Sequence, residues 1–87
     1  IRYSSDHILD YIELDENHAI FELMIPKEWV GKTVGQLDIR NIHRINIMAL
    51  KHDGVMDLNI GADTRIPPDH TMLVLGSMED IQKCFHI

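Results

Sequence analysis

Residues 37–51 read LDIRNIHRINIMALK. Their apolar side chains suit a protein core, and the second half of the run has the composition of a β-strand. Polar residues nevertheless interrupt it, among them Asp38, Arg40, His43, Arg44 and Asn46. The fold depends on where a helical segment gives way to a strand within this stretch. Why basic residues lie among so many isoleucines is a separate question.

Basic residues are concentrated around this stretch. Residues 1–26 hold one basic residue against six acidic ones, residues 27–51 hold five against two, and residues 52–87 hold two against six. The net charge of −6 argues against DNA or RNA as a partner, because general nucleic-acid binding requires many phosphates to be neutralised. A basic island of this size is compatible with one or two phosphates, but an ordinary solvated surface is the favoured interpretation at this point.

The composition describes one small globular domain. The chain has 87 residues, of which 45% are hydrophobic and 25% charged, so we expect a single domain over residues 1–87 with residues 1–6 as a linker. No apolar run reaches the ~18–20 residues of a membrane span, and no signal peptide opens the chain. The single cysteine, Cys84, excludes an internal disulfide and fits a reducing compartment. Because the chain begins with Ile1, we expect a segment of a longer protein.

Strand patterns account for most of the chain. Residues 7–14 and 19–25 predict an antiparallel hairpin, whose second strand is ended by Pro26. Residues 45–52 and 55–60 predict a second hairpin around the turn Asp53-Gly54. The continuous apolar run over residues 71–76 predicts a buried fifth strand.

Two capping signatures predict helices. Thr33 and Gln36 have the spacing of a capping box, so a short helix or two broken turns should follow. Ser77 opens the second signature, after which four residues form one helical face: Met78, Ile81, Cys84 and Phe85. The predicted fold class is α+β, a mostly antiparallel β-sheet with two short helices packed on it.

Motifs for catalysis or metal binding are weak. The run Gly31-Lys32-Thr33 resembles the end of a phosphate loop, but that motif requires glycine where Pro26 stands. The six histidines are scattered, without metal-ligand spacing, so no metal site is expected. No nucleophile and base, or carboxylate pair, occurs in a recognisable setting, and we predict that the chain is not an enzyme, with no catalytic residues.

Arg40 and Asn46 each have two readings. Arg40 lies near a predicted helix end, where a cation is favourable and can pair with Asp38 or with a partner chain. Asn46 lies between two isoleucines, where a structural amide bonded to backbone is the simpler interpretation. An asparagine can also recognise an adenine edge through N6 and N7. Residue chemistry alone favours the structural interpretation of Asn46.

Three segments in order resemble the TrkA-C (RCK C-terminal) domain. They are WVGKTVGQLDIR at 29–40, RINIMALK at 44–51 and the D-x-x-M-L-V-L-G strand at 69–76 followed by the closing helix. The resemblance extends from about His7 to Phe85. Each segment is moderately specific, and their ordered series is more so.

The resemblance implies a regulatory role. TrkA-C domains occur in cytoplasmic regulatory subunits of Trk and Ktr potassium-uptake systems, in potassium channels and in cation antiporters. They normally follow an N-terminal Rossmann-like RCK domain that binds ADP, ATP or NAD, and they form homodimers. The expected protein is therefore cytoplasmic, held at the inner face of the membrane through a potassium-translocating subunit, with no cofactor in this domain.

In the Ktr-type branch, cyclic di-AMP binds on the two-fold axis of the dimer and down-regulates potassium uptake. The family pattern, an Ile-Arg pair with an Asn-Ile pair six residues after the arginine, matches Ile39-Arg40 and Asn46-Ile47. The resemblance implies a cyclic di-AMP site of six residues, Ile39, Arg40, Ile42, Asn46, Ile47 and Ala62, with Asp38 orienting Arg40. A proline often found near Ala62 is absent here.

Two other functions remain open at this stage. The domain could be a purely structural dimerisation and gating module without a nucleotide ligand. It could also regulate a cation antiporter or a channel, responding to cations or pH through its histidine and acidic residues.

Overall fold

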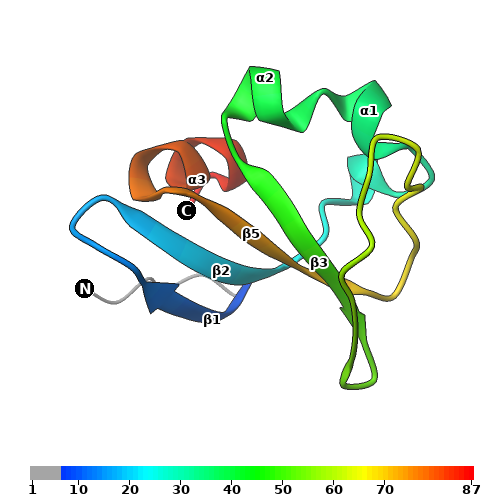
Figure 1. The fold of residues 1–87 in the computed structure, drawn as a ribbon, viewed down its shortest axis with the longest axis horizontal. Coiled ribbons are helices and arrows are strands. Elements are labelled where there is room, and N and C mark those ends of the chain that lie inside the picture. Colours follow the sequence, from blue (N-terminus) through cyan, green and yellow to red (C-terminus); the bar gives the residue numbers. More distant parts are fainter. Residues whose placement is uncertain (1–6) are drawn as a thin grey trace.

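The computed structural model describes residues 7–87 and contains one five-stranded sheet with helices on it (Figure 1). The strands are β1 (Ile8–Glu13), β2 (His18–Met24), β3 (Asn46–His52), β4 (Val55–Asp57) and β5 (Thr71–Ser77), and every pairing is antiparallel in the order β1-β2-β5-β3-β4. The helices are α1 (Val34–Leu37), α2 (Ile39–His43) and α3 (Met78–Phe85), with a short 3-10 turn, η1 (Lys27–Trp29). The predicted fold class is confirmed. The predicted linker, residues 1–6, lies outside the described residues.

One face of the sheet forms the core. Alternation along β2 buries Ala19, Phe21 and Leu23, while the residues between them remain partly accessible. Met72 and Val74 of β5 lie on the same side, and α3 contributes Ile81. The sequence pattern that predicted these strands is therefore the pattern that fills the core.

Trp29 joins the helices at one end of this core. Its ring lies 5.5 Å from the ring of Phe85 in α3 and 6.1 Å from that of His43 in α2, measured between centroids. Cys84 also packs against the core, and burial raises the pKa of its thiol to about 11. The thiol therefore stays protonated near neutral pH, as its predicted role as a small apolar helix residue requires.

The segment after Thr33 forms two short helices. Asp38 adopts a left-handed conformation, φ 49°, which ends α1 and begins α2, and Arg44 does the same at the end of α2, φ 59°. The second hairpin differs slightly from its prediction, because β4 ends at Asp57 and residues 58–60 leave the sheet. β4 pairs only with Leu50–His52, so the first residues of β3 lie at an edge of the sheet. Figure 1 shows α1 and α2 above this end of β3.

Close packing at the edge of the core generates a stability prediction. A Cβ added at Gly76 of β5 would lie 2.8 Å from Cγ2 of Ile45, whose branched side chain is buried and cannot move aside. We expect Gly76→Ala to lower the free energy of unfolding by about 1–3 kcal/mol, through overpacking. Urea unfolding measures this effect. Gly61→Ala is the control, because its added Cβ would meet no atom within 4 Å; equal stability of both variants would contradict the prediction.

Candidate ligand site

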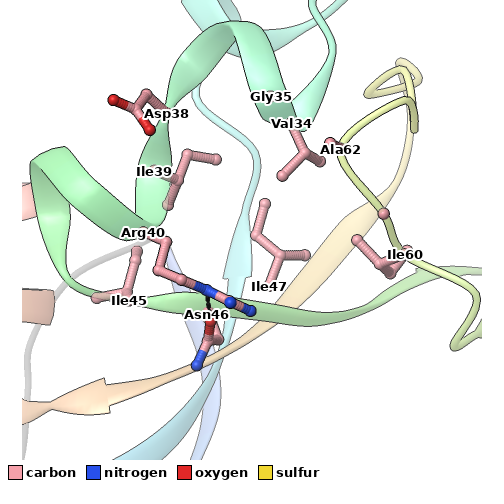
Figure 2. Close-up of a pocket in the computed structure, with 11 residues that line it drawn as sticks. Val34, Gly35, Asp38, Ile39, Arg40, Ile45, Asn46, Ile47, Ile60 and Ala62 are labelled. Carbon is pink, nitrogen blue, oxygen red and sulfur yellow. Dashed lines mark hydrogen bonds between the residues drawn. The ribbon is translucent and has the colours of Figure 1, made fainter.

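A pocket of about 260 Å³ lies where α1, α2, the start of β3 and the loop after β4 converge (Figure 2). Eleven residues line it: Val34, Gly35, Asp38, Ile39, Arg40, Ile45, Asn46, Ile47, Ile60, Gly61 and Ala62. Its walls are mainly aliphatic. Of the described residues that line it, Arg40 is the only cation and Asp38 the only carboxylate.

The two polar residues proposed from the sequence meet in this pocket. The Nε of Arg40 donates a hydrogen bond of 2.8 Å to Oδ1 of Asn46, and Figure 2 shows the Arg40 side chain reaching from α2 to the start of β3. The left-handed residue Arg44 ends the helix through its own N–H, which donates to the carbonyl of Arg40. The chain reverses there, which explains how a spacing of six residues brings two side chains together.

Asp38 does not perform the predicted task. Its Oδ1 accepts a hydrogen bond of 2.8 Å from Nδ2 of Asn41, and among the described residues it forms no ion pair with Arg40. Asn46 is the residue that holds Arg40. In this structure Asp38 therefore does not orient Arg40, and Figure 2 shows its side chain pointing away from the guanidinium.

The predicted apolar residues divide into three groups. Ile47 and Ala62 line the pocket, as expected from the resemblance. Ile39 also lines it but is only 2% exposed, so it mainly supports the floor. Ile42 is 64% exposed and does not line the pocket. Its proposed contact with a ligand remains a prediction that would require a second molecule.

Sequence reasoning missed the far wall of the pocket. Ile60 was placed in a strand, but β4 ends at Asp57 and Ile60 instead faces the pocket together with Gly61. Val34 and Gly35 were read as helix residues only. The glycine in α1 was the available signal, because glycine inside a short helix often marks a close approach of another chain segment.

The loop over residues 60–66 is tied to the start of α1. The N–H of Val34 donates to the carbonyl of Thr64, and the N–H of Gly35 donates to that of Ala62, both at 2.9 Å. The N–H of Gln36 also has no acceptor within the helix, and it donates to Oγ1 of Thr33 in the predicted capping box. These bonds use the helix donors that could otherwise hold an anion, so Arg40 is left as the cationic group for that task.

Metal binding finds no support in the described part of the chain. Within residues 7–87, no group of three or more His, Cys, Asp or Glu side chains is arranged to hold a metal ion.

Over the same residues, no helix combines the length and apolar character needed to cross a bilayer.

Comparisons with known proteins agree with the fold. Residues 18–87 match the model of the TrkA-C domain, and the chain belongs to this family. It is 34% identical over 79 residues to the Ktr system potassium uptake protein C of Bacillus subtilis (strain 168), covering 91% of this chain and 36% of the relative. It is also 33% identical over 58 residues to the K(+)/H(+) antiporter subunit KhtT of the same organism, covering 66% of this chain and 35% of the subunit.

A solved structure shares the same architecture. The RCK C domain of the potassium transport protein KtrA, in complex with cyclic diadenosine monophosphate, matches with a TM-score of 0.71 and 24% identity, covering 80% of this chain and 84% of that domain. At this identity the match concerns the fold. The chain spans about a third of the length of the curated relatives it matches.

The contact between Gly35 and Ala62 generates a prediction about the pocket wall. A Cβ added at Gly35 would lie 3.0 Å from the carbonyl oxygen and 3.3 Å from the Cβ of Ala62. Gly35→Ala should gain up to ~1 kcal/mol in helix propensity. It should also push the 60–66 loop outward and lengthen the 2.9 Å hydrogen bond from the N–H of Gly35 to the carbonyl of Ala62. Amide hydrogen exchange at position 35 should therefore become faster with little net change in stability. Unchanged exchange, as expected for the control Gly61→Ala, would contradict this.

Proposed function

We propose that this chain is the regulatory domain of a Ktr-type potassium-uptake system, and that it dimerises and binds cyclic di-AMP at the dimer interface to down-regulate potassium uptake. The observation behind the proposal is the Arg40–Asn46 pair at the side of an aliphatic pocket. Membership of the TrkA-C family and the similarity to potassium uptake protein C support the regulatory role.

The chemistry of the pocket suits a nucleotide. The Arg40 guanidinium can form charge-assisted hydrogen bonds with a phosphodiester, and Ile47 and Ala62 offer apolar contacts to a purine. The KtrA domain with the same fold was solved with cyclic diadenosine monophosphate. The missing proline near Ala62 leaves that wall less bulky than in the family pattern.

The size of the pocket supports a site shared between two chains. Its volume of about 260 Å³ is below the ~300–1,000 Å³ of pockets that enclose a drug-sized ligand. A cyclic dinucleotide has two equal halves, and an isologous dimer presents the same surface twice across its axis. One pocket would then hold one nucleotide half, with one Arg40 for each phosphate.

Exposed apolar side chains favour association of two chains. Ile42 is 64% exposed on α2 beside the site, and Val55 and Leu58 are 71% and 70% exposed. Burying an exposed apolar side chain such as Ile42 against a partner is favourable. With Ile42 at the interface, its predicted contact with the ligand would come from the neighbouring chain.

The remaining parts of the proposal concern the longer protein. An N-terminal nucleotide-binding RCK domain would precede this segment, and a membrane potassium-translocating subunit would hold the assembly at the cytoplasmic face. These relatives are nearly three times as long as their matched region, which supports a further domain. A second candidate is regulation of a cation antiporter, which the similarity to KhtT favours.

Binding of cyclic di-AMP to the chain tests the proposal directly. By isothermal titration calorimetry we expect one ligand per dimer and a dissociation constant in the micromolar range or tighter. A micromolar constant corresponds to a binding free energy of about −8 kcal/mol. Arg40→Ala should weaken binding at least ~10-fold, because it removes hydrogen bonds to a charged phosphate. Arg44→Ala is the matched control, since Arg44 belongs to the same basic island but does not line the pocket.

An absence of heat at high ligand concentration would overturn the cyclic di-AMP proposal and leave a structural or antiporter-regulating module. Equal losses in Arg40→Ala and Arg44→Ala would indicate attraction by general charge and not by this pocket.

Self-association is tested separately. Multi-angle light scattering of the chain should give the mass of a dimer, and Ile42→Glu should shift the population toward monomer, because a charge at a buried interface is costly. Leu14→Glu is the control, since Leu14 is similarly exposed, at 53%, but lies in the turn between β1 and β2. A monomer at all concentrations would count against the shared site.

A further inference from the structure

The bond between Arg40 and Asn46 determines which groups remain available to a ligand. The Nε of arginine can only donate, so the atom of Asn46 that receives it is Oδ1, and the assignment of the amide follows from the bond itself. The amide atom that remains available to a ligand is then Nδ2, which is a donor. The part of the guanidinium that remains available is the edge formed by its two Nη atoms.

This arrangement is poorly suited to reading adenine. Bidentate recognition of the adenine edge needs an acceptor for the N6 amino group and a donor for N7, both from one asparagine amide. In this chain the acceptor, Oδ1, already receives Nε of Arg40 at 2.8 Å. Asn46 would have to release or share that bond to read the base.

The arrangement is well suited to holding a phosphate. The Nη edge of a guanidinium donates two parallel hydrogen bonds, which match two oxygens of one phosphate. Arg40 is an exposed residue on a helix of five residues, so its long side chain would otherwise sample many rotamers. The bond to Asn46 selects one of them.

Asn46 is itself held firmly. It is partly buried, it begins β3, and it pairs with Leu75 of the adjacent strand. The residue before it, Ile45, is 1% exposed and anchors the chain in the core. A fixed acceptor on the sheet therefore orients a flexible cation on the helix.

We infer that Asn46 is a positioning residue, which acts on the ligand through Arg40 by presenting the Nη edge of the guanidinium to a phosphodiester. This inference rests on the proposed function. It concerns how the pocket recognises its ligand and assigns phosphate recognition, and not base recognition, to this pair.

A double-mutant cycle tests the inference. Calorimetric titration with cyclic di-AMP would compare the unaltered chain, Asn46→Ala, Arg40→Lys and the double variant. Lysine keeps the charge but has no Nε donor for Asn46 to hold. With Arg40 present, we expect Asn46→Ala to weaken binding roughly three- to tenfold, the effect of freeing one long side chain. In the Arg40→Lys background, we expect the same substitution to weaken binding less than about twofold.

A loss of the same size in both backgrounds would show that Asn46 contacts the ligand directly, and would overturn the inference while leaving the proposed function intact. No binding by the unaltered chain would overturn the proposed function and this inference with it.

A second measurement does not depend on affinity. In nuclear magnetic resonance of the free chain, the Nε–H signal of Arg40 should exchange slowly with water and should exchange faster in Asn46→Ala. The Nε–H of Arg44 serves as the internal control and should not change. An Arg40 signal unaffected by Asn46→Ala would mean that the bond does not orient the guanidinium, and would overturn the inference.

Discussion

Burial of two isoleucines determines the geometry of the site. Ile39 is 2% exposed and Ile45 is 1% exposed, and each is followed immediately by a polar residue of the pocket, Arg40 or Asn46. An anchored side chain fixes the backbone on which the next residue is displayed. The apolar character of the 37–51 stretch and the position of Arg40 within it therefore have one explanation. The two isoleucines hold the chain in the core, and the polar residue that follows each of them, Arg40 or Asn46, lines the pocket.

Much of the fold could be predicted because its signals are local. The alternation in β2, the left-handed turn at Asp53 and Gly54 and the capping box at Thr33 each depend on residues close in sequence. The limits of α2 could not be predicted in the same way. Asp38 and Arg44 adopt positive φ without being glycine, a conformation that is uncommon for such residues, so the sequence does not mark these helix ends.

The candidate site was predictable mainly within residues 37–51, and outside them only at Ala62. The Arg40–Asn46 spacing and Ile47 come from residues 37–51, which the family resemblance covers well. Ile60 was missed because β4 ends early, at Asp57, and the loop then turns back to bond with α1. Ile42 was included from the family resemblance; it is 64% exposed and does not line the pocket of the single chain, so its contact with a ligand stays a prediction.

The charge of the whole chain limits how an anionic ligand could be recognised. The net charge of −6 repels a phosphate at long range, but at physiological ionic strength this repulsion is screened beyond about 8 Å. Attraction must then come from direct contact with Arg40, the one cation lining the pocket in the described chain. A cation that acts only at contact is effective only if it is correctly oriented. The hydrogen bond from Asn46 matters for this reason, because an acidic domain with a single oriented cation favours a ligand whose shape fits the pocket over other anions of equal charge.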